Sequence, residues 1–231
     1  MKLLAFETAT EACSVALNID GEIVERFEVA PRRHAELALP WAERLLAEAG
    51  VAKSQLDAVA VGRGPGAFTG VRLAVALAQG IALALDLPVT PVSTLRALAA
   101  QGQGGNILAA IDARMGEIYA ATFRRDGDDI VADSDEAVIA PSDYALPGQG
   151  GDWIGLGTGF AAESGALQAR LAGRIAHLDA AALPHAADVA RLGALAFARG
   201  EAIAAESVEP AYLRNDVALT LQQQQALRAL R

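Results

Sequence analysis

The sequence predicts an α/β protein built from two lobes of related topology. The chain has 231 residues, enough for two lobes that each bury a core, and its apolar residues are mainly aliphatic, since 53% of the residues are hydrophobic but only 5% are aromatic. Short strand-like segments at the start of the chain are followed by helical patterns. The same succession then restarts after the flexible stretch Gln101-Gly102-Gln103-Gly104-Gly105.

Three strands open the first lobe. Residues 3–6 form a short apolar run, and residues 13–19 and 22–29 have the alternation typical of half-buried strands. Asp20-Gly21, between the last two segments, is a hairpin signal. The sequence therefore predicts that these strands pair in an antiparallel manner.

Helices and two more strands complete this lobe. Residues 34–49 have helical spacing, and Gly50 is a favoured residue for ending the helix. Residues 57–61 predict a buried strand, residues 71–85 a long apolar helix, and residues 87–92 a further strand followed by a short helix. Three antiparallel strands followed by alternating helices and strands are typical of an RNase H-like lobe.

The second lobe repeats this pattern in a weaker form. Strands are predicted at residues 106–111, 117–123, 130–139 and 153–156, followed by helices at residues 160–171 and 187–199. Two such lobes in one chain describe an actin-like (ASKHA) duplicated architecture with a reduced second lobe. We expect the lobes to span residues 1–102 and 103–231, with the C-terminal tail packing back on the first lobe.

Charge and cysteine content exclude several functional classes. The net charge of −9 is unsuited to gripping RNA directly, because nucleic-acid affinity comes largely from basic residues that contact phosphates. Cys13 is the single cysteine, so neither an intrachain disulfide nor a thiolate zinc site can form. The opening residues lack the apolar core of a signal peptide, and no uncharged stretch reaches the ~18 residues of a membrane span. We therefore expect a cytoplasmic protein.

Several motifs give a more specific indication. The stretch GPGAFTGVR at residues 64–72 leads directly into the apolar helix. It strongly resembles the signature of the TsaB family, also called YeaZ. Further segments resemble the same family in the same order, and they are spread over almost the whole chain: LLAFETATEACSVAL, RRHAELALPWAERLL, IDARMGEIYAATF, GLGTGF and EPAYLRND.

The resemblance implies a role in tRNA modification. Members of the family have the two-lobe actin-like fold, form a homodimer when alone, and form a heterodimer with TsaD, their catalytic paralogue. The ATPase TsaE joins this assembly, which moves threonylcarbamoyl from its adenylate to N6 of adenosine 37, the base next to the anticodon of tRNA. The resemblance implies that this chain contributes no catalytic group, and we expect it to bind no cofactor.

The glycine-rich loop has a structural and a ligand-binding interpretation. Glycines before a helix can cradle a phosphate, but a Walker loop requires Lys and Ser or Thr after its last glycine, and Val71 and Arg72 stand there instead. Pro65 can fix one turn angle, Gly64 and Gly66 can adopt unusual ones, and Thr69 can cap the helix. We therefore assign a structural role to the loop residues Gly64, Pro65, Gly66, Thr69 and Gly70.

The helix at residues 71–85 predicts a subunit interface. Only Arg72 and Gln79 are polar in it, so its surface is apolar all round. We expect a ridge of larger residues to face the sheet and a row of small ones to admit a neighbouring helix; the ridge is Leu73, Leu77, Ile81 and Leu85, and the row is Ala76, Gly80 and Ala84. With the helix at residues 34–49, this row forms the predicted partner interface, which comprises His34, Leu37, Trp41, Leu45, Phe68, Arg72, Ala76, Gly80 and Ala84.

Metal and thiol chemistry receive little support. His34, His177 and His185 show none of the spacings that hold a metal, whereas the catalytic paralogue carries a paired-histidine motif in the region where this chain has only His34. Cys13 lies between apolar neighbours inside a predicted strand, where a thiol packs as a small hydrophobic group. We expect neither metal binding nor peptidase activity.

Nucleotide binding between the lobes is the main alternative. An actin-like ATPase or phosphotransferase would use Glu7, Asp112 and the glycine loop at residues 155–159. Glu7 and Glu11 lie near the first strand end without a basic residue in between, so a triphosphate would be repelled. The interaction protein and the nucleotide enzyme therefore remain as two hypotheses, with the first favoured.

Overall fold

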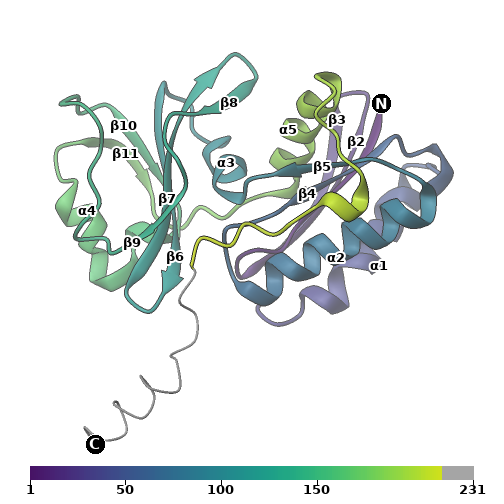
Figure 1. Cartoon of the computed structure of the whole chain (residues 1–231), viewed down its shortest axis with the longest axis horizontal. Coiled ribbons are helices and arrows are strands. Elements are labelled where there is room, and N and C mark those ends of the chain that lie inside the picture. The colour runs from purple at the N-terminus through teal and green to yellow at the C-terminus, as the bar shows by residue number, and fades with distance from the viewer. Residues whose placement is uncertain (215–231) are drawn as a thin grey trace, which may run out of the picture.

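The computed structural model describes residues 1–214, and residues 215–231 of the predicted tail lie outside this range. Two β-sheets lie beside each other, each with its own helices, and the chain runs from the first to the second and back (Figure 1). The predicted fold class, two α/β lobes with a reduced second lobe, is confirmed.

The first sheet has five strands in the order β3-β2-β1-β4-β5. They are β1 (Lys2–Glu7), β2 (Ala12–Ile19), β3 (Glu22–Val29), β4 (Ala58–Gly62) and β5 (Val89–Val92). The first three pair antiparallel, and β4 and β5 continue the sheet in parallel with β1. Strands β1, β2 and β4 are almost wholly buried, because helices cover both faces of this sheet.

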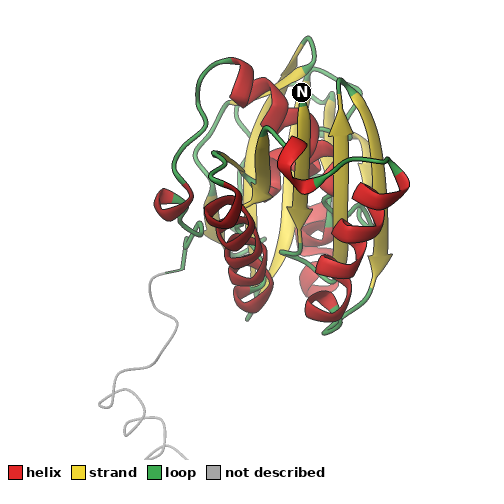
Figure 2. Cartoon of the chain, turned by 90° about the vertical axis from the view of Figure 1, so that its right-hand side faces the viewer, coloured by secondary structure: helices red, strands yellow, loops and turns green. Residues whose placement is uncertain are grey.

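Helices lie on both faces of the first sheet (Figure 2), and alternating side chains of β1 divide the core of this lobe into two layers. Leu4 and Phe6 pack under α1 (His34–Glu48) and α2 (Phe68–Leu85). Leu3 and Ala5 point the other way, toward α5 (Ala186–Ala198). The short η1 (Lys53–Gln55) and η4 (Ala205–Ser207) complete the lobe.

Helix α5 corrects the sequence-based assignment of residues 187–199 to the second lobe. It packs across β1, β2, β4 and β5 of the first sheet. Conversely, α3 (Thr94–Ala99) packs on β6 and β7 of the second sheet. The periodicity of a helix identifies its apolar face but not the sheet that this face covers. The sequence therefore could not show that α5 packs on the first sheet and α3 on the second.

Gly193 is the point of closest approach between α5 and the first sheet. A Cβ at this position would lie 2.6 Å from the Cβ of Ala60 and 2.8 Å from Oγ1 of Thr90. We expect Gly193→Val to lower the free energy of unfolding by about 1–3 kcal/mol, because the helix must move off the strands. Denaturant unfolding measures this loss. An equal loss for Gly80→Val in α2, where a Cβ would have no neighbour within 4 Å, would contradict packing as the cause.

The second sheet has the order β11-β10-β6-β7-β8, and β9 pairs with β7 beside β8. Its strands are β6 (Asn106–Arg114), β7 (Glu117–Asp126), β8 (Asp129–Ala132), β9 (Ala137–Ile139), β10 (Trp153–Leu156) and β11 (Ile175–Asp179). The segment predicted as one strand at residues 130–139 is thus two strands. Strand β11 is not predicted by the sequence, since Ile175–Asp179 has little alternation in hydrophobicity.

The predicted helix at residues 160–171 is also wrong. The segment contains two 3₁₀ turns, η2 (Thr158–Phe160) and η3 (Ala162–Gly165), and only a short helix, α4 (Ala166–Arg170). Glu163 and Ser164 have φ values of 47° and 57°, which no right-handed helix can contain. The apolar spacing is helical, but these two backbone conformations interrupt the hydrogen bonding.

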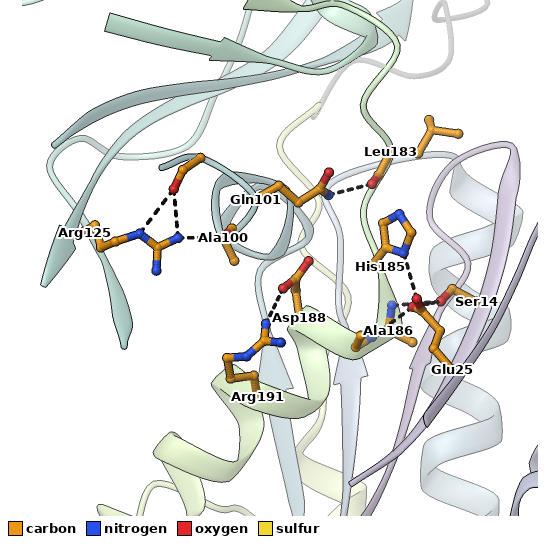
Figure 3. A network of polar contacts seen from close by, with 12 residues as sticks. Ser14, Glu25, Ala100, Gln101, Arg125, Leu183, His185, Ala186, Asp188 and Arg191 are labelled. Atoms are coloured by element: carbon orange, nitrogen blue, oxygen red, sulfur yellow. Dashed lines mark hydrogen bonds and ion pairs between the residues drawn. The ribbon is translucent and has the colours of Figure 1, made fainter. Parts of the chain in front are cut away.

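Polar contacts hold the two chain crossings between the lobes together (Figure 3). Nε2 of Gln101, in the first crossing, donates to the carbonyl oxygen of Leu183 in the second at 2.7 Å. Arg125 of β7 donates to carbonyl oxygens of the first crossing, including that of Ala100 at 2.6 Å. His185, at the end of the second crossing, lies 2.8 Å from Oε2 of Glu25 on β3. We refer to the two crossings, residues 100–105 and 180–185, as the hinge.

Candidate partner face and interlobe cleft

Helix α2 begins one turn earlier than its apolar run suggests. It starts at Phe68, and its N-cap residue, Ala67, makes no side-chain cap hydrogen bond. Thr69 therefore lies inside the first turn and is not the cap that the sequence predicts. The helix ends at Leu85, and Asp86 follows in the left-handed conformation.

The buried side of α2 consists of small residues. Gly70, Val71, Ala74, Val75, Ala78 and Ala82 face the first sheet. The larger residues predicted to form this ridge, Leu73, Leu77, Ile81 and Leu85, are only half-buried and lie along its margins. Small side chains let the helix axis come close to the strands. The rotation of α2 about its own axis that the sequence predicts is therefore wrong by part of a turn.

The opposite side of α2 is exposed and apolar. The small row Ala76, Gly80 and Ala84 is exposed, and Leu83 beside it is 62% accessible. By length and composition, α2 is the one helix within residues 1–214 that could span a membrane, yet only 28% of it is buried inside the lobe. Since its other side packs on the sheet, we treat it as a lobe helix with an uncovered face.

Helix α1 contributes less to this face than the sequence predicts. Trp41 is 9% and Leu45 2% accessible, so both belong to the core beneath the helices and not to the exposed surface that the sequence predicts. His34 and Leu37 are half-buried, and Leu39, which was not predicted, is exposed. The helical period explains this result, because a face that buries positions 38, 41, 42, 45 and 46 turns Leu39 outward. We call the exposed residues Leu39, Phe68, Arg72, Ala76, Gly80, Leu83 and Ala84 the α1–α2 face.

The glycine-rich loop packs on the turn between β1 and β2. Gly64 has a φ of +93°, as an unusual turn requires, and the Gly64–Pro65 peptide is cis. Gly66 has no positive φ, contrary to expectation. Glycine is required at position 66 because a Cβ there would lie 2.4 Å from the carbonyl oxygen of Ala9. Glycine is required at position 70 because a Cβ there would lie 2.0 Å from the carbonyl oxygen of Thr8.

Glu7 lies under this loop and does not reach the cleft. Its side chain is 1% accessible. Oε1 accepts from N–H of Ala9 at 2.7 Å, and Oε2 accepts from Oγ1 of Thr94 at 2.9 Å. Oγ1 of Thr94 in turn accepts from N–H of Gly64 at 3.2 Å. Burial raises the pKa of the Glu7 carboxyl from 4.5 to about 7, against the opposing effect of these hydrogen bonds.

A cleft of about 520 Å³ separates the lobes at the starts of α1 and α2. Its walls include His34, Gly66, Thr69, Asp112 and Thr158. Asp112 pairs with Arg114 two residues further on, at 2.9 Å. The remaining lining residues are partly small or aliphatic and partly polar, the polar ones being Thr10, Glu11, Arg32, Arg114 and Tyr119.

The glycine loop at residues 155–159 has a packing role. A Cβ at Gly157 would lie 2.3 Å from the carbonyl oxygen of Ala110, and one at Gly159 would lie 2.8 Å from the Cβ of Ala110. These glycines let the loop rest directly on β6. Within residues 1–214, no group of three His, Cys, Asp or Glu side chains lies close enough to hold a metal ion.

The surroundings of the three histidines and of Cys13 differ from one residue to the next. Nε2 of His34 lies 3.0 Å from the carbonyl oxygen of Thr10, at the start of α1. His177 is exposed on β11, and His185 stacks on Phe27 with ring centroids 4.2 Å apart. Cys13 is fully buried, and burial raises the pKa of its thiol to about 12, which leaves it protonated at neutral pH.

Arg72 has a partner that sequence reasoning missed. Its guanidinium carbon lies 3.5 Å from the centroid of the Phe68 ring, and its Nε donates to the hydroxyl of Tyr212 at 2.5 Å. The EPAYLRND motif contains Tyr212, so the signal was present. Pairing it with the start of α2 required the tertiary structure.

Comparison with known proteins identifies the family. Residues 26–221 match the family model described as TsaD, tRNA N6-adenosine threonylcarbamoyltransferase. The tRNA threonylcarbamoyladenosine biosynthesis protein TsaB of Escherichia coli K12 is 41% identical over 225 residues, which cover 94% of this chain and 96% of that protein. The chain belongs to the TsaB family. The Haemophilus influenzae TsaB is 39% identical over 94% of this chain and 95% of its own length.

Solved structures agree with the TsaB assignment. YeaZ from Pseudomonas aeruginosa superposes with a TM-score of 0.86 at 45% identity and covers 92% of this chain and 99% of its own. The sequence-based resemblance is thereby confirmed. The family is one of tRNA threonylcarbamoyladenosine biosynthesis proteins, and the match to the TsaD model relates this TsaB-family chain to the transferase family as well.

Proposed function

We propose that this chain is a non-catalytic scaffold subunit in the synthesis of threonylcarbamoyladenosine at position 37 of tRNA. It pairs with TsaD through the α1–α2 face, forms a homodimer through the same face when alone, and admits the ATPase TsaE to the assembly. TsaD then transfers threonylcarbamoyl to N6 of the adenosine. The complex acts in the cytoplasm, where tRNA is modified.

The uncovered side of α2 is the observation that carries this proposal. A row of small residues beside the exposed Leu83, together with the exposed Leu39 of α1, leaves apolar area in water, at a cost that a second subunit would remove. Alanine and glycine in the row allow a helix of the partner to approach closely. Trp41 and Leu45 support the face from beneath, as part of the core.

The described residues also favour a scaffold over a nucleotide enzyme. Glu7, the acid expected to serve a magnesium nucleotide, is sealed under the glycine loop by hydrogen bonds to Ala9 and Thr94. Asp112 is paired with Arg114. Because the whole chain carries a charge of −9, contact with tRNA is assigned to the partner.

Gly80→Arg tests the proposal. Nothing lies within 4 Å of a Cβ at Gly80, so the arginine fits the monomer, and arginine is favoured over glycine in a helix by about 1 kcal/mol. In the dimer or heterodimer the same side chain places charge and bulk where two helices should nearly touch. We expect self-association, measured by sedimentation, and co-purification with TsaD to be lost, while thermal unfolding of the monomer is unchanged or improved.

Gln168→Arg is the matched control, since Gln168 is exposed on α4, away from the α1–α2 face. It should leave both associations intact. Full pairing of a folded Gly80→Arg variant would show that the contact surface lies elsewhere. Turnover of Mg-ATP by the purified chain alone would instead support the nucleotide-enzyme alternative.

A further inference from the structure

The chain crosses between the lobes a third time near its C-terminus. The first two crossings form the hinge, where Gln101 joins them. After α5 the chain runs along the first lobe, and the described residues end beside β6 of the second, as Figure 1 shows in yellow. We call residues 203–214 the strap; it includes most of the EPAYLRND motif, to which the proposed function gives no task.

The strap is attached to the first lobe along its length. Ile203 and Val89 of β5 exchange two backbone hydrogen bonds of 2.9 Å. Nε2 of Gln79 on α2 donates to the carbonyl oxygens of Ala205 and Val208, at 3.1 and 3.2 Å. Gln79 is thus one of two polar residues of α2 that hold the strap to this helix, the other being Arg72.

The next contacts lie at the mouth of the cleft. N–H of Ala211 donates to the carbonyl oxygen of Arg63, at the base of the glycine-rich loop, at 2.8 Å. One residue further, the Tyr212 hydroxyl accepts from Arg72, whose guanidinium is held over the ring of Phe68. A stacked guanidinium has little freedom, so this anchor is pre-organised.

The strap then fastens to the second lobe through Arg214. Its guanidinium pairs with the carboxylate of Glu117 and donates to the carbonyl oxygen of Arg114 at 3.3 Å. These two residues lie on either side of the turn between β6 and β7. The side chain of Arg214 is only 16% accessible, which places the ion pair partly out of water, where it is screened less than a surface pair.

We propose that the strap is a clasp that sets the opening of the cleft between the lobes. Two crossings at one edge form a hinge, and a hinge alone permits the lobes to rotate. A third attachment between the lobes restricts this rotation, because Tyr212 and Arg214 are only two residues apart and bind to different lobes. Arg114, which lines the cleft, is touched by Arg214 directly. The clasp shares Phe68 and Arg72 with the α1–α2 face, but it holds the two lobes of one chain together and its test requires no partner.

Distances between spin labels on the two lobes test the clasp. Gln55 and Gln168 are exposed on different lobes and lie outside the strap, so each can be changed to cysteine and labelled, with Cys13→Ala removing the native thiol. The labelled protein is diluted with an excess of unlabelled protein, so that a homodimer adds no distances between subunits, and we expect one narrow distance distribution for the otherwise intact chain. Combining Tyr212→Ala with Arg214→Ala should broaden this distribution and shift it, as the lobes rotate about the hinge.

Two further variants make the result decisive. Arg124→Ala removes an arginine that pairs with Asp126 and Asp133 inside the second lobe, and it should leave the distribution unchanged. Glu117→Gln removes the negative charge that pairs with Arg214, and it should broaden the distance distribution to an intermediate extent. If the double variant fails to fold, the distribution of Glu117→Gln decides the test. Distributions for the folded variants that match the intact chain would overturn the clasp.

Discussion

Gly70→Ala is expected to destabilise the protein by about 3 kcal/mol or more, a large part of the roughly 5–15 kcal/mol that holds a typical domain together. The added Cβ would lie 2.0 Å from the carbonyl oxygen of Thr8. Both groups are backbone-fixed, because Oγ1 of Thr8 also donates to the carbonyl oxygen of Gly70 at 2.7 Å. Either the end of β1 or the start of α2 must move.

Gly80→Ala is the control for this prediction, since it makes the same change in the same helix. Nothing lies within 4 Å of a Cβ at Gly80. Alanine should therefore stabilise the monomer by about 1 kcal/mol through helix propensity. Denaturant unfolding of both variants should give shifts of opposite sign, and a stabilised Gly70→Ala protein would refute the close contact between α2 and β1.

Glu7→Gln is expected to change how stability depends on pH. The carboxyl keeps its proton in the folded chain up to about pH 7, whereas its ordinary pKa of 4.5 applies when the chain is unfolded. Its contribution to stability is therefore fully present below pH 4.5 and is lost as the pH rises through 7. The loss amounts to about 3 kcal/mol over this window.

The Glu7→Gln protein should lack this loss, because glutamine does not titrate. The amide cannot reproduce every hydrogen bond of the carboxyl group, including the one to Thr94. The unfolding free energies of the two proteins can therefore differ by a constant amount at all pH values. The informative quantity is the difference between their unfolding free energies, followed from about pH 4 to 8 by denaturant titration; the other groups that titrate in this range cancel. Parallel curves would show that Glu7 is not a buried, proton-holding carboxyl.

Local patterns were sufficient for much of this protein. The alternation in residues 13–19 and 22–29 and the Asp20-Gly21 turn predicted β2, β3 and their hairpin. The apolar surface of residues 71–85 predicted both a long helix and an exposed apolar side. These features depend on residues close together in sequence, where periodicity carries the information.

Other features depend on which surfaces meet. The sequence misplaced Trp41 and Leu45 at the surface, because helical spacing does not say whether an apolar stripe faces its own sheet or a partner. Glu7 lies at the end of the first strand, the position expected of a residue that binds a nucleotide. Only the packing of the glycine-rich loop over Glu7 shows that its side chain is sealed from the cleft.

The family, the two-lobe class, the long apolar helix and the lack of cysteine pairs can be read from the amino-acid order, since each follows from composition or from an ordered set of motifs. The folded chain was needed to show which side of α2 is exposed, that α5 covers the first sheet, and that Tyr212 and Arg214 join the lobes. Those outcomes require contacts between residues as far apart as Arg72 and Tyr212, and such contacts form only when the chain has folded.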